Sequence, residues 1–243
     1  MTGVIASELL KLRTARSNVI LAIAGVGLAI LISVLTVLFD SNPTTDVLIS
    51  DAEFCVLFTL ILGAMSIAGE MRHGSIAPSL LVTPSRTELL LGKLVAIVIA
   101  GAAIGALAFG GSLAAGALLL PGQGFDFGLS SSEVIKDIAA GAAIAALYGV
   151  MGLGAGALLR NQTGAIIVLL MTLFFVDPLV ASLWTHYAPY SLGGVLASAT
   201  GAPGQGPADE PVAQGTALAL QLGYSTLLFL IGLFAFNRVD ITD

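Results

Sequence analysis

Long apolar segments alternate with short polar segments along the whole chain, and this alternation is the main structural signal in the sequence. A helix needs about 20 consecutive apolar residues to cross the hydrocarbon core of a bilayer. The pattern therefore predicts an all-α membrane protein with six transmembrane helices, in which residues 1–243 form a single domain. The predicted spans are residues 18–39, 51–69, 88–120, 134–159, 162–184 and 216–236.

Serine followed three residues later by glutamate predicts where three of these helices begin. In such a capping box each of the two side chains binds the backbone N–H of the other residue. The pairs are Ser50 with Glu53, Ser85 with Glu88 and Ser130 with Glu133, at the starts of the second, third and fourth spans.

The composition agrees with a membrane protein and excludes one class of partner. Hydrophobic residues make up 57% of the chain, and the mean hydropathy is +1.01, which is far above the values of soluble domains. The net charge of −6 leaves no basic stripe for phosphates, so we expect no nucleic-acid partner. The single cysteine, Cys55, excludes an intrachain disulfide.

The distribution of basic residues predicts the orientation in the membrane. Six spans place both termini on one side, and the side richer in lysine and arginine is normally cytoplasmic. The opposite side carries only Lys136, so both termini are predicted to be cytoplasmic. Residues 185–215 then form an external loop, within which 191–200 is a possible re-entrant or interfacial segment. The basic residues on the side of the termini are Lys11, Arg13, Arg16, Arg72, Arg86, Lys93, Arg160 and Arg238.

Residues 1–17 precede the first span and have an amphipathic pattern. Ile5, Leu9 and Leu12 recur at helical spacing, with basic residues at the flanks. This arrangement predicts a helix lying in the membrane interface. The alternative is a short basic anchor that only fixes topology.

The loop at residues 70–87 is polar and contains signals for a short helix. Gly74 ends the second span, Ser75 is a possible N-cap, and Pro78 falls where the first turn tolerates proline. About two turns of helix follow, over residues 76–82. A rigid helix held between two spans would transmit a push from a partner to both spans, whereas the alternative is a well-capped connector.

The string GEMRHGSIAPSLLVTPSRTELLLGK, residues 69–93, resembles the cytoplasmic loop of bacterial export-type (type 2) ABC transporter permeases. That loop carries an acidic and basic pair, Gly-Ser or Gly-Thr, and then Thr-Pro, Ser-Arg and Gly-Lys at this spacing. The N-terminal string SELLKLRTARS, residues 7–17, is similar to the opening of the same family. Pro78 departs from the family pattern, in which a helix-favouring residue is commoner.

The resemblance implies a fold, partners and site residues. It implies a permease subunit in the bacterial plasma membrane, paired with a second permease as homodimer or heterodimer, above two ATPase subunits that bind ATP and Mg. The loop helix would be the coupling helix that docks on the ATPase, and Glu70 would pair with Arg13 or Arg16 of the interfacial helix. The implied coupling residues are Arg72, His73, Gly74, Ser75, Ile76, Ser79, Leu80, Leu81 and Val82.

Motifs for catalysis are missing from the sequence. Gly92-Lys93-Leu94 lacks both the upstream glycine and the hydroxyl of a phosphate-binding loop, and neither His-Glu-x-x-His nor Gly-x-Ser-x-Gly occurs. We therefore expect no catalytic residue, no metal and no cofactor in this chain, with ATP hydrolysis in the partner.

The alternative functions are a secondary transporter or channel, or a structural membrane protein without an ATPase. The first class normally needs ionisable groups inside the membrane. The predicted spans have none at mid-depth, and Asp177 comes nearest. Because Asp177 precedes Pro178, it either ends its helix or lines the substrate path. Apolar walls would suit a hydrophobic or amphipathic substrate.

Small residues in the third and fourth spans predict close helix packing. We expect packing within the chain, with a dimer seam as the alternative. The glycines concerned are Gly101, Gly105, Gly149, Gly152, Gly154 and Gly156.

Overall fold

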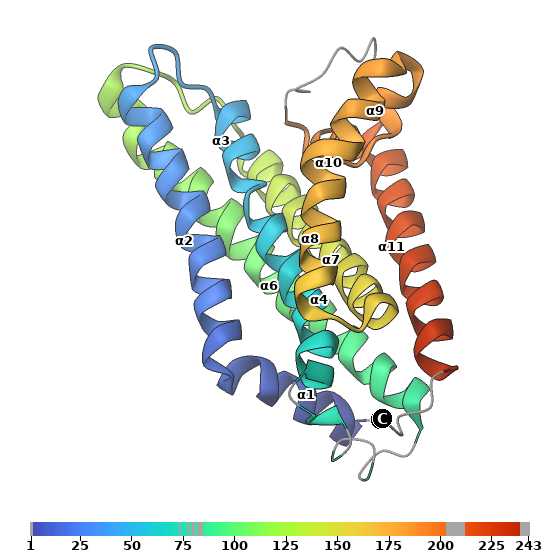
Figure 1. Ribbon diagram of the computed structural model, residues 1–243. Helices are drawn as coiled ribbons and strands as arrows, with labels where there is room; N and C mark the ends of the chain where they lie inside the picture. The colour runs from blue at the N-terminus through green and yellow to red at the C-terminus, as the bar shows by residue number, and fades with distance from the viewer. Residues whose placement is uncertain are drawn as a thin grey trace.

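The computed structural model describes residues 2–72, 74–76, 78, 81, 85–202 and 212–238, and helices dominate these residues (Figure 1). The long elements are α2 (Arg16–Phe39), α4 (Cys55–Arg72), α6 (Arg86–Leu119), α7 (Ser131–Leu159), α8 (Gln162–Met171) and α11 (Gln214–Asn237). The shorter helices are α1 (Thr2–Thr14), α3 (Thr45–Ala52), α9 (Asp177–Leu183) and α10 (Leu192–Thr200). Short 3-10 helices cover Pro121–Gln123 and Thr185–Tyr190.

Six stretches of the described chain are long and apolar enough to cross a membrane, which confirms this part of the predicted fold. They are Arg16–Phe39, Thr45–Arg72, Arg86–Gln123, Ser131–Leu159, Gln162–Leu183 and Gln214–Asn237. The second consists of α3 and α4, and the fifth consists of α8, a π turn at Thr172–Val176 and α9. These features identify a multi-pass membrane protein.

Two of the three predicted helix starts are correct. Ser130 and Glu133 form the complete capping box at the start of α7, and Ser85 accepts the backbone N–H of Glu88 at the start of α6. The prediction at Ser50 is wrong, because α3 begins at Thr45 and the Ser50 hydroxyl donates to the Asp46 carbonyl inside it. The chain leaves helical geometry only at Glu53 and Phe54, between α3 and α4.

Helix α7 is the centre of the bundle, and glycines on three of its faces allow close contact with α4, α6 and α11. A Cβ atom on Gly152 would lie 1.9 Å from the carbonyl oxygen of Leu60 in α4. A Cβ on Gly105 of α6 would meet the Gly141 carbonyl at 2.4 Å, and one on Gly232 of α11 would meet the Gly154 carbonyl at 2.3 Å. The glycines therefore pack within the chain, as predicted.

The fifth span continues past the proline that was expected to interrupt it. Pro178 lacks a backbone N–H, and its ring conflicts with regular α-helical geometry. The π turn at Thr172–Val176 directly precedes Asp177 and Pro178, and the helix resumes as α9 to Leu183. Helix termination at Asp177 is therefore a wrong prediction.

Both ends of the described chain lie at the same end of the bundle. Helix α1 lies across this end, at the bottom of Figure 1, and packs against the first turns of α6. The end of α11 reaches the same turns, where Arg86 donates to the Phe236 carbonyl and Thr87 hydrogen-bonds with Asn237. We call this the α1 end.

Candidate functional site

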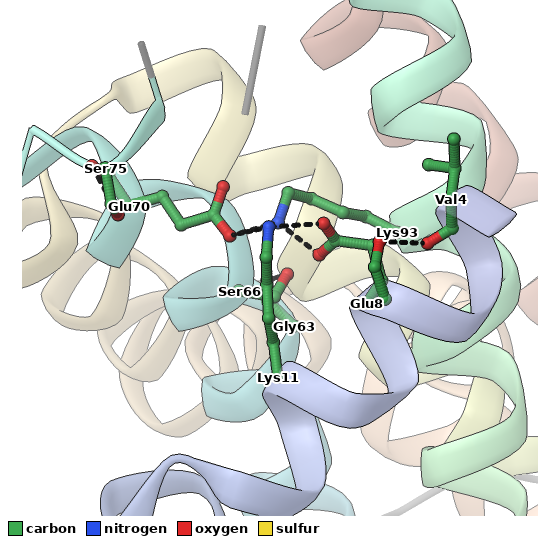
Figure 2. Close-up of polar contacts among 9 residues, drawn as sticks. Val4, Glu8, Lys11, Gly63, Ser66, Glu70, Ser75 and Lys93 are labelled. Carbon is green, nitrogen blue, oxygen red and sulfur yellow. Dashed lines mark hydrogen bonds and ion pairs between the residues drawn. The ribbon is translucent and has the colours of Figure 1, made fainter. Parts of the chain in front are cut away.

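Two glutamates and two lysines form a closed cluster of ion pairs at the α1 end (Figure 2). Lys93 Nζ lies 2.6 Å from Glu8 Oε2 and 2.7 Å from Glu70 Oε1. Lys11 Nζ lies 2.6 Å from Glu8 Oε1 and 3.0 Å from Glu70 Oε1. Each lysine thus bridges both carboxylates, and the four charges balance. We call Glu8, Lys11, Glu70 and Lys93 the ion cluster.

The ion cluster connects three helices that are far apart in the sequence. Glu8 and Lys11 are three residues apart on α1, Glu70 is near the end of α4, and Lys93 is in the third turn of α6. Gly92 allows α1 to approach, since a Cβ there would lie 2.6 Å from Val4 Cγ1. The neighbouring Lys93 can then reach Glu8 directly.

The cluster is largely removed from water, which makes its charge balance necessary. The Lys93 side chain is 1% exposed and that of Glu8 is 5% exposed, whereas Lys11 is 43% exposed. A buried charge is tolerated when it is paired and hydrogen-bonded. Partial burial lowers the pKa of Lys11, but hydrogen bonds and charges from Glu8 and Glu70 outweigh it, so the pKa is raised and Lys11 stays protonated.

An open cavity of about 780 Å³ adjoins the cluster. The cluster residues form part of its wall, together with Ser17 and Asn18 at the start of α2, Ser66 of α4 and Gln162 of α8. Two buried oxygens in this wall, Glu70 Oε2 and Gln162 Oε1, accept no hydrogen bond from the described residues. Each of these oxygens is an acceptor that a hydrogen-bond donor brought next to it would satisfy.

The loop after α4 begins with the geometry that its glycine predicts. The Gly74 N–H binds the Met71 carbonyl and the Ser75 N–H binds the Glu70 carbonyl, while Gly74 has φ of 68°. This is the Schellman pattern of a helix end. It confirms that Gly74 ends the second span and fixes the chain direction directly after Glu70 and Arg72.

The predicted coupling residues have different environments. Ile76 is 5% exposed and packs with Ile67, Leu89, Leu90 and Phe236, so it belongs to the core of the bundle and is not available to a partner. Leu81 is 84% exposed, and Arg72, Gly74 and Ser75 are also exposed. His73, Ser79, Leu80 and Val82 lie outside the described residues.

Glu70 pairs with lysines and not with the predicted arginines. Its carboxylate contacts Lys11 and Lys93, whereas Arg13 and Arg16 are exposed and form no ion pair with described residues. Arg13 is two residues beyond Lys11, which places it roughly 200° further around the helix, away from Glu70. The prediction identified the correct helix and the wrong side chains.

Sequence reasoning missed Glu8 and the burial of Lys93. Lys93 is one of the basic residues that predict the cytoplasmic side, although its neighbours in the sequence are apolar residues of the predicted third span. The only signal in the sequence was that Glu8 and Lys11 lie in one of the two segments that resemble permeases, and Lys93 lies in the other.

A second polar region, separate from the ion cluster, contains acidic residues within the candidate span Thr45–Arg72. Glu53 lies between α3 and α4 and accepts a hydrogen bond from the Thr200 hydroxyl of α10. Asp51 accepts one from Thr36 at 2.7 Å. Glu53 was predicted at the very start of the second span, but the candidate span begins at Thr45, so Glu53 lies about 12 Å inside it at 1.5 Å per residue.

Asp177 ties together the segment that follows the fifth span. Its Oδ1 accepts hydrogen bonds from the Tyr187 hydroxyl at 2.8 Å and from the Leu192 N–H at 3.0 Å, and its Oδ2 accepts the Gly193 N–H at 3.2 Å. Asp177 is 5% exposed and thus caps the start of α10. These contacts occupy both oxygens, so the geometry favours a structural role over contact with a substrate.

The segment at residues 191–200, predicted to be re-entrant or interfacial, forms α10. It packs against α11 and α7, with Val195, Ala199 and Thr200 buried. The Tyr148 hydroxyl of α7 donates to the Leu192 carbonyl at 3.0 Å, which holds the start of α10 against the central helix.

Comparison of the sequence with protein-family models gave no match, and a search of curated proteins gave none either. The six candidate spans and the ion cluster describe a multi-pass helical membrane protein with buried charges at one end.

Proposed function

We propose that this chain is the membrane-spanning permease subunit of an ABC exporter in the bacterial plasma membrane, driven by a separate ATPase. Two permease subunits, this chain and a second one, would pair above two ATPase subunits that hold ATP and Mg. The substrate would be hydrophobic or amphipathic, because the spans offer mainly apolar surface.

The observation that carries the proposal is the ion cluster and its position next to the loop. Glu70 is two residues before the end of α4, where the loop begins, and it contacts both α1 and α6. A displacement of the loop would therefore act on three helices at once. A connector without a partner has no need for such a linkage.

An exposed leucine and the charge distribution support the same proposal. Leu81 is 84% exposed on a loop at the α1 end, and exposed apolar side chains of this kind suit contact with a protein partner. Lys11, Arg13, Arg16, Arg72 and Arg160 gather near the α1 end, which the positive-inside rule makes cytoplasmic.

The proposal is tested by purifying the tagged chain from its native membranes. We expect an ATPase with a phosphate-binding loop to co-purify and to hydrolyse ATP. Leu81→Asp should release this ATPase, because a charge would enter an apolar contact, while Leu81→Met should retain it. Isolation of the chain without any ATPase, or equal retention by both variants, would contradict the proposal.

Glu53 favours one other candidate, a transporter driven by an ion gradient. An acid inside a span, at a break between two helices, is a common feature of ion-coupled transport. Such a protein would be purified alone, and its transport in vesicles would follow the imposed gradient without ATP.

A further inference from the structure

A second cavity at the α1 end, of about 370 Å³, has an unusual lining for a chain with a net charge of −6. Among the described residues its wall consists of Arg72, Arg160, Asn161, Gln162 and Thr163, which are all polar and include two arginines and no acid. Arginine binds phosphate oxygens with several N–H groups in a fixed plane. The charge of this cavity therefore suits a phosphate group.

The fold holds one of these arginines in place. Arg160 follows α7 in a left-handed conformation with φ of 55°, and its Nη2 donates to the Ala235 carbonyl of α11 at 3.1 Å. Arg160 forms no ion pair with the described residues, so its other N–H groups can reach an anionic ligand. Arg72, at the end of α4, is exposed and forms no ion pair with the described residues.

The larger cavity beside the ion cluster provides the opposite chemistry. It shares Arg72 and Gln162 with the smaller cavity, so the two adjoin. Two of its lining residues carry the buried acceptors Glu70 Oε2 and Gln162 Oε1, which receive no hydrogen bond from described residues. A primary ammonium group has three N–H donors and a positive charge, which would satisfy both oxygens.

An apolar stripe leads away from the smaller cavity along α8. Thr163 lines the cavity, and Ile167 and Met171 follow at four-residue intervals on the same face. Ile167 is 54% exposed and Met171 is 51% exposed, within a candidate span whose apolar window is only 11% buried. In a membrane this stripe faces lipid chains.

We propose that the two cavities together bind the headgroup of a phospholipid that carries a primary amine. The phosphate lies between Arg72 and Arg160, the ammonium group faces Glu70 Oε2 and Gln162 Oε1, and the acyl chains run along the Thr163, Ile167 and Met171 face of α8. The site does not depend on the proposed ATPase. The bound lipid would fill the space between α1, α4 and α8 and support the ion cluster from the side.

A membrane lipid fits the observations better than an acidic side chain of a protein partner. A carboxylate would satisfy the arginines but would face the buried Glu70 Oε2 with a like charge. A partner protein also gives no reason for a stripe that continues into a membrane span. A zwitterion with apolar chains matches the arginines, the two acceptors and the stripe.

The test measures lipid binding to the purified full-length chain by native mass spectrometry. The probes are dioleoyl phosphatidylethanolamine and dioleoyl phosphatidylcholine, which share the phosphate and chains but differ in the N–H donors of the headgroup. We expect phosphatidylethanolamine to bind about tenfold more tightly, which corresponds to one charge-assisted hydrogen bond. Free phosphoethanolamine should bind more weakly than the lipid, because it lacks the chains.

Two variants separate the two halves of the headgroup. Arg72→Gln should weaken both lipids about tenfold, since it removes a phosphate contact. Gln162→Leu should reduce the preference for phosphatidylethanolamine, because Glu70 Oε2 remains as the second acceptor, and should leave the binding of phosphatidylcholine unchanged. Arg13→Gln is the matched control, because Arg13 is exposed and lines neither cavity.

Several results would overturn the proposal. Equal binding of both lipids to the wild-type chain would exclude recognition of the amine, and equal losses in Arg72→Gln and Arg13→Gln would exclude a phosphate site at Arg72. Binding of phosphoethanolamine as tight as the lipid would indicate a soluble ligand. Release of a co-purified ATPase by Arg72→Gln with unchanged lipid binding would assign the arginine to that partner.

Discussion

At the scale of single residues, the placement of Lys93 differs most from its sequence context. A lysine near the start of a span normally extends its ammonium group to the headgroups. Here the side chain is 1% exposed and its Nζ is held between the carboxylates of Glu8 and Glu70. The alternative, an unpaired ammonium in the same place, would cost several kcal/mol. The two glutamates therefore make the burial of the charged Lys93 possible.

This pairing predicts a non-additive pair of substitutions. Lys93→Met should destabilise the purified protein by about 3–5 kcal/mol, because it leaves two buried carboxylates with one lysine. Combining it with Glu8→Gln should recover part of this loss, because the buried charge is then balanced again. The thermal midpoint of unfolding of the four proteins in one detergent measures the effect. Strictly additive losses would mean that the two side chains do not interact.

Lys11 and Lys93 have the same partners in the ion cluster but differ in their exposure to solvent. Lys11 is 43% exposed, so water screens its two ion pairs and partly replaces them when they are broken. Lys93 has no such access. The two lysines share the same partners but differ in the solvation that each loses on folding.

At the scale of helices, the close packing of α7 depends on glycines, which have no side chain. The backbones of α4 and α7 approach so closely that the Gly152 position has no room for a methyl group beside the Leu60 carbonyl. Such contacts are the main way for helices to associate where surrounding lipid is as apolar as the side chains. The glycines of α7 therefore determine which helices surround it.

Substituting these glycines tests the close contact. Gly152→Ala should destabilise the protein by on the order of 1–3 kcal/mol, because α4 must move away from α7 and loses packing. Gly223→Ala in α11 is the control, because a Cβ there meets nothing within 4 Å. Alanine favours a helix over glycine, so the control should be neutral or slightly stabilising. Equal thermal midpoints for the two variants would argue against the α4 and α7 contact.

At the scale of the whole molecule, the two ends of the bundle differ in chemistry. The α1 end has the ion cluster, both cavities, and the end of α11 beside the first turns of α6. The opposite end has the polar ties between α9, α10 and α3, which involve Asp177, Tyr187 and the pair of Glu53 and Thr200. The difference in basic residues between the ends predicts that the α1 end faces the cytoplasm.

Cysteine labelling tests this orientation. In a Cys55→Ala background, a cysteine at Gln123 should react with an impermeant thiol reagent added to intact cells, whereas one at Thr14 should react only after the cells are opened. Both positions are exposed, and they lie at opposite ends of the bundle. The reverse pattern would invert the topology and remove the cytoplasmic position that the proposed ATPase contact requires.

Features that depend on local physical chemistry could be predicted from the amino-acid sequence. The six candidate spans follow from the length of the apolar runs, because a helix rises 1.5 Å per residue and the hydrocarbon core has a fixed thickness. The capping box at Ser130 and the helix end at Gly74 follow from neighbouring residues whose side chains and backbone are in reach of one another. These signals need no knowledge of which helices pack together.

Which polar groups pair across the bundle depends on how the helices pack, and the sequence did not predict it. Glu8 and Lys93 are 85 residues apart in the sequence, and Glu53 and Thr200 are 147 residues apart. Whether such groups pair depends on the rotation and depth of each helix, which are set by close contacts such as those of Gly92 and Gly152. The sequence placed Glu70 correctly beside the N-terminal helix, but a rotation of that helix decides between Arg13 and Lys11. Because a change of one residue turns a helix face by about 100°, the ionic partner is a property of the packed bundle and not of the helix alone.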